Sequence, residues 1–214
     1  MQKKIVCVAL AILACVAPPA QGAAPVAPAS AAQVAARQRL ALTGIEVSTE
    51  RLVQFAAQGD RTVVDLLLAA GASVNGADTL RRSTALHNAS AQGHVQLAAS
   101  LLERGGAVDA RDWHGNTPLI EAAYAGHLAV VQLLLAHGAV VDTVSDEGVT
   151  ALTAAIYAGS PSMVAYLLAR GANASMPAQT DALPLQVARR RGQAALAALI
   201  ERHLATQFMN GNKP

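Results

Sequence analysis

The chain has 214 residues, of which 53% are hydrophobic and only 3% aromatic, with 16 Lys and Arg against 14 Asp and Glu. This length and apolar content exclude disorder along the whole chain and fit one domain or a short repeat array. The scarcity of aromatic residues favours an all-α fold over a β-sandwich, and the near balance of charge excludes a nucleic-acid partner.

The first 22 residues are typical of an export signal. Two lysines precede an apolar run over residues 5–17, which is shorter than the ~20 residues of a membrane-spanning helix. Residues 20–22 place small side chains where a signal peptidase cleaves, so we expect the mature chain to begin near Ala23. The sequence therefore predicts a signal peptide over residues 1–22 and a periplasmic, secreted protein of bacterial origin.

An alternative interpretation of the same segment involves Cys15. The stretch Ile12-Leu13-Ala14-Cys15 resembles a bacterial lipobox, in which Cys15 would carry a lipid and tether the protein to a membrane. The residues before Cys15 fit that pattern poorly. Because Cys7 and Cys15 are the only cysteines, a mature domain that begins at Ala23 has none and needs no disulfides.

Two segments without repeat motifs flank the central part of the chain. Residues 23–47 are expected to form a spacer rich in Ala and Pro, up to about residue 36, followed by an N-terminal helix. Residues 205–214 are expected to form a flexible tail.

A 33-residue period runs through the centre of the chain. The tetrapeptide at 84–87, Thr-Ala-Leu-His, has counterparts at 117–120 and 150–153, and a weaker one at 183–186. Two series of glycines keep the same phase: Gly93, Gly126, Gly159 and Gly192, and Gly105, Gly138 and Gly171. A fixed period of this length predicts a stack of repeats, because one unit alone cannot bury its apolar face.

Each unit has the start and stop signals of two short helices. Thr84, Thr117 and Thr150 are suited to cap a helix N-terminus, and Pro118 in the first helical position leaves no amide unpaired. The inter-helix glycine favours a left-handed C-cap, and an apolar second helix follows it.

The repeat resembles that of the ankyrin family, which opens with T-P-L-H and closes with G-A-D-V-N. The closing motif is found at residues 71–75, 105–109, 138–142 and 171–174. The resemblance covers about residues 48–204 and implies an all-α ankyrin-repeat solenoid of helix-turn-helix units with β-hairpin finger loops. The implied units are 48–78, 79–111, 112–144, 145–177 and 178–204.

The finger that precedes Thr84 departs from the family pattern. Leu80, Arg81 and Arg82 replace the usual D-x-x-G turn, and the loop holds one extra residue. The conformation of this finger therefore stays open.

The resemblance also implies where a partner would bind, because ankyrin proteins use finger tips and the exposed end of each first helix. The corresponding residues are Arg81, Trp113, His114, Asn116, Tyr124, Asp146, Glu147, Tyr157, Arg190 and Arg191. Aromatic and arginine side chains are enriched in binding hot spots. Chance exposure is the alternative for any single aromatic, and a solvated polar cap is the alternative for the two arginines near the C-terminus.

No catalytic or metal-binding motif is found in the sequence. It lacks G-x-S-x-G, a Walker loop, H-E-x-x-H and a Gly-rich dinucleotide turn. His94 and His127 recur at one repeat position, and His87 fills the T-P-L-H position, which favours structural roles over a zinc site. We therefore predict no enzyme activity, cofactor, metal or small-molecule substrate.

The expected function is protein binding. The sequence predicts a monomeric interaction module of the cell envelope that binds a protein partner through its finger tips and concave helix face. The alternative is a membrane-tethered lipoprotein that acts as an accessory, a scaffold or a toxin-neutralising factor.

Overall fold

The chain folds into two parallel rows of helices. The computed structural model describes residues 30–177 and 182–211, so the predicted signal peptide lies outside the described residues. The inner row comprises α2 (Thr49–Gln58), α4 (Ala85–Ala91), α6 (Pro118–Ala125), α8 (Ala151–Tyr157) and α10 (Pro184–Arg190). The outer row comprises α1 (Ala31–Leu42), α3 (Arg61–Ala69), α5 (Val95–Glu103), α7 (Leu128–Ala136), α9 (Pro161–Ala169) and α11 (Ala194–Gly211).

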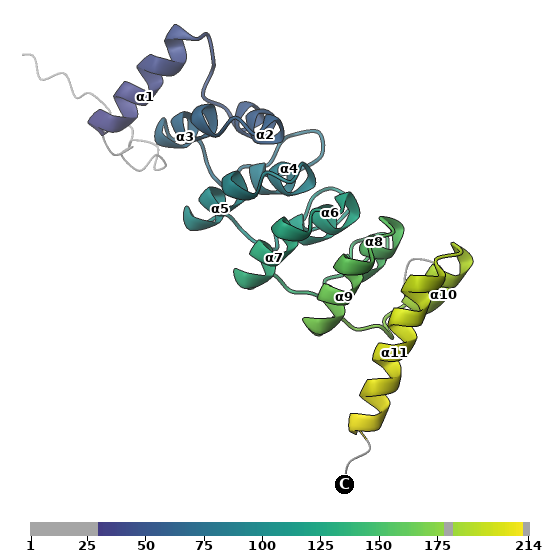
Figure 1. Cartoon of the computed structure of the whole chain (residues 1–214). Helices are drawn as coiled ribbons and strands as arrows, with labels where there is room; N and C mark the ends of the chain where they lie inside the picture. Colours follow the sequence, from purple (N-terminus) through teal and green to yellow (C-terminus); the bar gives the residue numbers. More distant parts are fainter. Residues whose placement is uncertain (1–29, 178–181, 212–214) are drawn as a thin grey trace, which may run out of the picture.

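Each helix packs mainly on its neighbour in the same row and on its partner in the same unit. Figure 1 shows the units following one another along a single axis, from α1 at one end to α11 at the other. The all-α repeat solenoid expected from the 33-residue period is therefore confirmed.

Threonine caps start three of the inner helices, as predicted. The hydroxyl of Thr84 accepts the amide of His87, and the hydroxyl of Thr150 accepts the amide of Thr153. Thr117 caps α6 in the same way, with Pro118 as its first residue. These bonds satisfy amides that would otherwise lack an intrahelical partner.

The core is a column of aliphatic side chains that runs the length of the solenoid. One buried position of the outer helices recurs in every unit: Leu40, Leu67, Leu101, Leu134, Leu167 and Ile200. Stacking therefore buries in a neighbouring unit the apolar stripe that a single helix pair would expose.

Histidine side chains tie successive units together. His94 Nε2 donates to the carbonyl of Ala57 at 3.2 Å, and His127 Nε2 donates to the carbonyl of Ala91 at 3.1 Å. A Cβ on Gly93, where φ is +77°, would lie 2.6 Å from the His127 ring, so glycine is required there. The repeating histidines therefore act in packing between units.

Helix α1 is the outer helix of a half unit. It ends at Leu42 with Thr43 as its C-cap, and beyond the cap the Gly44 amide donates to the Ala41 carbonyl and the Ile45 amide to the Leu40 carbonyl. The outer helix α3 ends with the same pair of bonds. The chain then enters α2 without a finger, so α1 covers the N-terminal end of the stack.

Both flanking segments are more helical than the sequence analysis predicted. Helix α1 begins at Ala31, where the prediction placed a spacer, because Ser30 caps it and its apolar face packs on the first repeat. Helix α11 runs to Gly211, through most of the predicted tail, and no helix breaker interrupts its sequence before that glycine. In the described ranges, no helix has both the length and the apolarity to cross a membrane.

The fingers are joined edge to edge by backbone hydrogen bonds. The Trp113 amide donates to the Arg81 carbonyl at 2.8 Å, and the Asp146 amide donates to the His114 carbonyl at 2.9 Å. The two bonds occupy the same register, one repeat apart. They hold three successive fingers side by side along the inner row.

The fingers are loops rather than regular hairpins over the described residues, where the only bridge outside helices is an isolated antiparallel pair, Ala77 and Thr84. That bridge belongs to the finger with the extra residue. Here Arg82 has φ +54°, a left-handed conformation that glycine supplies in the next two fingers, at Gly115 and Gly148. The arginine is strained in this position because its Cβ crowds the backbone.

Candidate functional site

A groove of about 520 Å³ runs between the fingers and the inner helices of the third and fourth units. Its lining residues are His114, Asn116, Ile120, Glu121, Tyr124, Glu147, Val149, Tyr157 and Arg191. We call it the inner groove. A second hollow of about 380 Å³ adjoins it at His114 and Glu121, which line both, and extends toward Arg81 and α4.

Two tyrosines lie in register along the inner groove. Tyr124 is in the last turn of α6, and Tyr157 occupies the same position in α8, one repeat later. The Tyr124 side chain is 62% exposed. The Tyr157 ring is half-buried, and the Arg191 guanidinium lies 5.2 Å from its centroid.

The finger that carries His114 is held by a buried carboxylate. Asp112 accepts the amide of His114 at 2.9 Å and the amide of Asn116 at 2.8 Å. In the next finger, the Ser145 hydroxyl accepts the amide of Val149 at 3.0 Å. These bonds fix the groove-lining side of both fingers before any partner arrives.

A contact between a histidine and a carboxylate joins the two fingers at the rim of the inner groove. His114 Nδ1 lies 3.0 Å from Glu147 Oε1, and both side chains are more than half exposed. Exposed pairs of this kind add little to stability. Their effect here is on the shape and charge of the rim.

Glu121 lies half-buried at the point where the inner groove meets the second hollow. Its Oε1 accepts a hydrogen bond from Asn116 Nδ2 at 3.1 Å. Burial raises the pKa of the Glu121 carboxyl, and the nearby Asp112 carboxylate raises it further. The Asn116 hydrogen bond and the more distant Arg81 and His114 oppose this rise in the pKa with smaller effects. Among the described residues, no Lys, Arg or His lies within ion-pair distance of this carboxylate.

His87 lies buried beneath the second hollow and has a structural role. The Thr84 amide donates to its Nδ1 at 3.2 Å, and its Nε2 donates to the Asn116 carbonyl at 3.1 Å. Burial lowers the pKa of His87, which favours the neutral ring that this bonding requires. The described part of the chain contains no group of three or more His, Cys, Asp or Glu side chains that could hold a metal ion.

The structure brings most of the predicted binding residues into one surface. His114, Asn116, Tyr124, Glu147, Tyr157 and Arg191 line the inner groove, and Arg81 lines the second hollow. Their role in binding stays a prediction.

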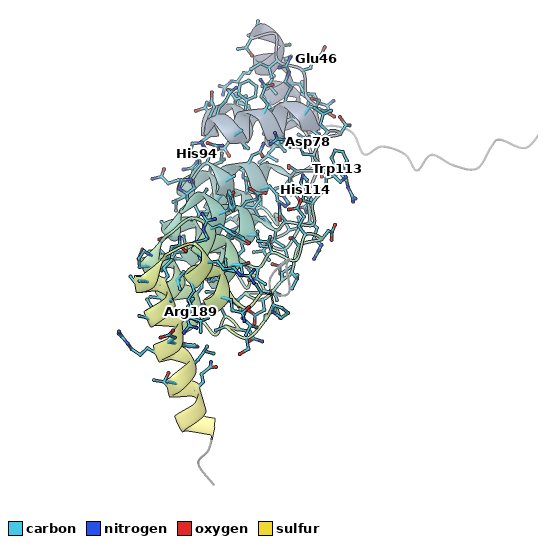
Figure 2. The ribbon with its side chains drawn as sticks, turned by 90° about the vertical axis from the view of Figure 1, so that its right-hand side faces the viewer. Glu46, Asp78, His94, Trp113, His114 and Arg189 are labelled. Atoms are coloured by element: carbon cyan, nitrogen blue, oxygen red, sulfur yellow. The ribbon has the colours of Figure 1, made fainter. Side chains whose placement is uncertain are left out.

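Three predicted residues lie outside both hollows. Trp113 is 67% exposed at a finger tip, where it stacks on His114 with 6.2 Å between ring centroids. Figure 2 shows both side chains on the side of the solenoid opposite His94. Asp146 pairs with Arg111 at 3.0 Å, and Arg190 is exposed on α10.

The predicted binding residues do not include three residues that line the inner groove, Ile120, Glu121 and Val149, of which only Glu121 is charged. The positions that correspond to Glu121 in the neighbouring units hold Asn88 and Ala154. A charged residue at this otherwise neutral repeat position, three residues before Tyr124 on the same helix face, was the available signal.

Comparison with family models gives two matches that follow each other along the chain. The model described as ankyrin repeats (3 copies) matches residues 52–145, and the model described as ankyrin repeat matches residues 147–181. Together they cover more than half of the chain and lie within residues 48–204, where the sequence resembles ankyrin repeats. A search of curated proteins gave no match.

Proposed function

Because the chain belongs to the ankyrin-repeat family, we propose that it is a binding module whose inner groove receives a segment of a partner protein. Ankyrin repeats generally mediate protein–protein interaction, and proteins built from them are generally non-enzymatic. The observation that carries the proposal is the row formed by Tyr124 and Tyr157 between two fingers that are already fixed.

The expected binding free energy of the two tyrosines supports the proposal. An exposed tyrosine ring that becomes buried contributes apolar area at a low entropic cost, since only two torsions are immobilised. Rigid fingers lower the cost further, because few loop residues must be ordered on binding. Truncation of one such anchor typically costs about 2 kcal/mol or more of binding free energy.

Affinity capture with matched variants tests the proposal. Wild-type protein and a Tyr124→Ala, Tyr157→Ala double variant are used as baits in an envelope extract, and the captured proteins are quantified by mass spectrometry. Tyr166→Ala is the control, because Tyr166 lies on the outer helix α9 and also has an arginine, Arg170, over its ring at 5.7 Å.

We expect one protein to be captured by the wild-type bait and by the Tyr166→Ala control, but not by the double variant. A partner captured equally by all three baits would contradict binding in the inner groove.

We also propose that this module acts in the cell envelope, as a monomer before it binds its partner. The proposal is supported by the sequence of residues 1–22, with two lysines, an apolar run and small residues at its end. Intact-mass measurement of the protein from its native host tests it. A chain that begins at Ala23 supports export with cleavage, whereas a Cys15 start with added acyl mass supports the lipoprotein alternative. An unprocessed N-terminus would contradict both.

A further inference from the structure

We propose that the partner segment presents an arginine or lysine side chain to the inner groove, and that Glu121 receives its charged group between Tyr124 and Tyr157. This inference rests on the proposed function and adds the chemistry of the partner.

The distribution of charge in the groove carries the inference. His114 is already paired with Glu147 at the rim, and Arg191 already lies over the Tyr157 ring. Glu121 is the remaining charged side chain that lines the groove, and no described cation lies within ion-pair distance of it. The groove therefore offers a carboxylate that Arg81 and His114 stabilise only from beyond ion-pair distance.

The placement of Glu121 makes a docked cation favourable. A half-buried carboxylate has lost some of its hydrogen bonds to water, and the single hydrogen bond from Asn116 replaces only some of these. An opposite charge brought in by a partner would restore the missing interaction in a site partly shielded from water, where Coulomb attraction is stronger than at an open surface. The raised pKa of Glu121 has the same physical cause, burial next to Asp112.

The tyrosines suit a basic side chain better than an acidic or purely aliphatic one. Glu121 and Tyr124 are three residues apart on α6 and share one face of the helix. A tyrosine ring attracts a cation to its face, and this chain already uses that contact twice, between Arg191 and Tyr157 and between Arg170 and Tyr166. The ring of Tyr124, 62% exposed, is available for a third.

Selection from a random peptide library tests the inference without knowledge of the partner. A phage-displayed library of 12-residue peptides is selected on the wild-type protein, and the enriched peptides are synthesised. Each peptide is also made with its arginine replaced by citrulline, or its lysine by norleucine. Dissociation constants are measured by fluorescence anisotropy against wild type, Glu121→Gln and Glu103→Gln. Glu103 is the matched control, because it is exposed at the end of the outer helix α5.

The inference predicts enriched peptides with a basic residue at one position. Neutralising that residue should weaken binding to wild type and to Glu103→Gln by about 10- to 100-fold, as for a hydrogen bond to a charged group. The same change should have little effect on Glu121→Gln, because the two groups act as a pair. Glutamine keeps the acceptor for Asn116, and the peptide replacement needs no protein variant at all, so misfolding cannot produce this pattern.

Two other results overturn the inference and differ in what they leave standing. In the first, the peptides lose affinity for the Tyr124→Ala, Tyr157→Ala variant but need no basic residue, or they bind Glu121→Gln as tightly as wild type. This result would refute only the role of Glu121. A selection that yields no peptide dependent on the two tyrosines would contradict the proposed function as well.

Discussion

Several polar side chains are buried between the helices, and their hydrogen bonding differs. Ser90 is fully buried in α4, and its hydroxyl has no hydrogen-bond partner among the described residues. Ser100 is also buried, in α5, but its hydroxyl accepts Arg104 Nε at 3.4 Å. A buried hydroxyl without a partner loses its bonds to water and gains nothing in return.

The first prediction compares these two serines. Ser90→Ala should raise the free energy of unfolding by about 1 kcal/mol, because alanine removes the unsatisfied hydroxyl and keeps the Cβ. Alanine already occupies the corresponding position in the next unit, at Ala123. Ser100→Ala should be neutral or destabilising. Urea unfolding measures both, and a destabilised Ser90→Ala would show that the hydroxyl does have a partner.

The second prediction concerns the pH dependence of stability at Glu121, whose folded-state pKa lies above the ordinary value of 4.5. Above the folded-state pKa the residue is ionised in both states, and its charge costs folding free energy. Glu121→Gln should therefore be more stable than wild type at neutral pH. The difference should shrink as the pH falls through the folded-state pKa and disappear below about 4.5, where both states are protonated. Chemical denaturation at several pH values measures it, and a constant difference would contradict the assignment.

The first finger and the first helix depart most from a regular repeat. The sequence showed that the loop between Asn75 and Thr84 has one extra residue, but it did not show which residue of the turn takes the left-handed conformation. The turn types that accommodate one more residue differ in which position takes a left-handed conformation. The structure puts Arg82 there, in the place of the glycines of the next two fingers.

The third prediction follows from the backbone of Arg82. Arg82→Gly should stabilise the protein by roughly 0.5–1 kcal/mol, since relief of the left-handed strain exceeds the entropy that glycine adds to the unfolded chain. The control is Arg81→Gly, because φ at Arg81 is not positive and that change should be destabilising. Thermal unfolding of the two variants separates these outcomes, and equal effects would argue against strain at Arg82.

The fourth prediction tests the half unit formed by α1. Leu40 is 1% exposed and begins the buried aliphatic column, whereas Leu42 on the same helix is 89% exposed. Leu40→Ala should lower the free energy of unfolding by about 2–5 kcal/mol through loss of buried volume, if α1 is part of the cooperative fold. Leu42→Ala should change it by less than about 0.5 kcal/mol. Equal effects would mean that α1 does not cover the stack.

Sequence reasoning missed this half unit because the marker that it used was the opening tetrapeptide. A half unit without a first helix has no such tetrapeptide. The signal that ends its helix was present, because Gly44 follows α1 as Gly71 follows α3, and both glycines have positive φ. However, the absence of a finger shortens the spacing between these two glycines to 27 residues, so a search at period 33 passes over it.

The period, the threonine caps and the inter-helix glycines together predicted the solenoid, because each is a sequence feature with a known structural consequence. The groove was only partly predictable. The resemblance to ankyrin repeats implied that Tyr124 and Tyr157 lie at the exposed ends of first helices. The depth of Glu121, by contrast, depends on how the fingers pack against α6, and no local pattern encodes that packing.

The continuity of the core also explains how this molecule can present a fixed surface. The buried aliphatic column joins every unit to the next, and backbone bonds join the fingers at their edges. A partner that contacts two neighbouring units would therefore bind a surface whose parts are already in place, with little ordering cost.

Hydrogen exchange on the complex with a captured partner tests the inner groove most directly. We expect binding to slow amide exchange in the two fingers that flank the groove, residues 112–117 and 145–150, while the outer helices α5, α7 and α9 keep their free-state rates. Slowed exchange in those outer helices, with unchanged fingers, would show that the partner binds the opposite face and that the inner groove is not the binding site.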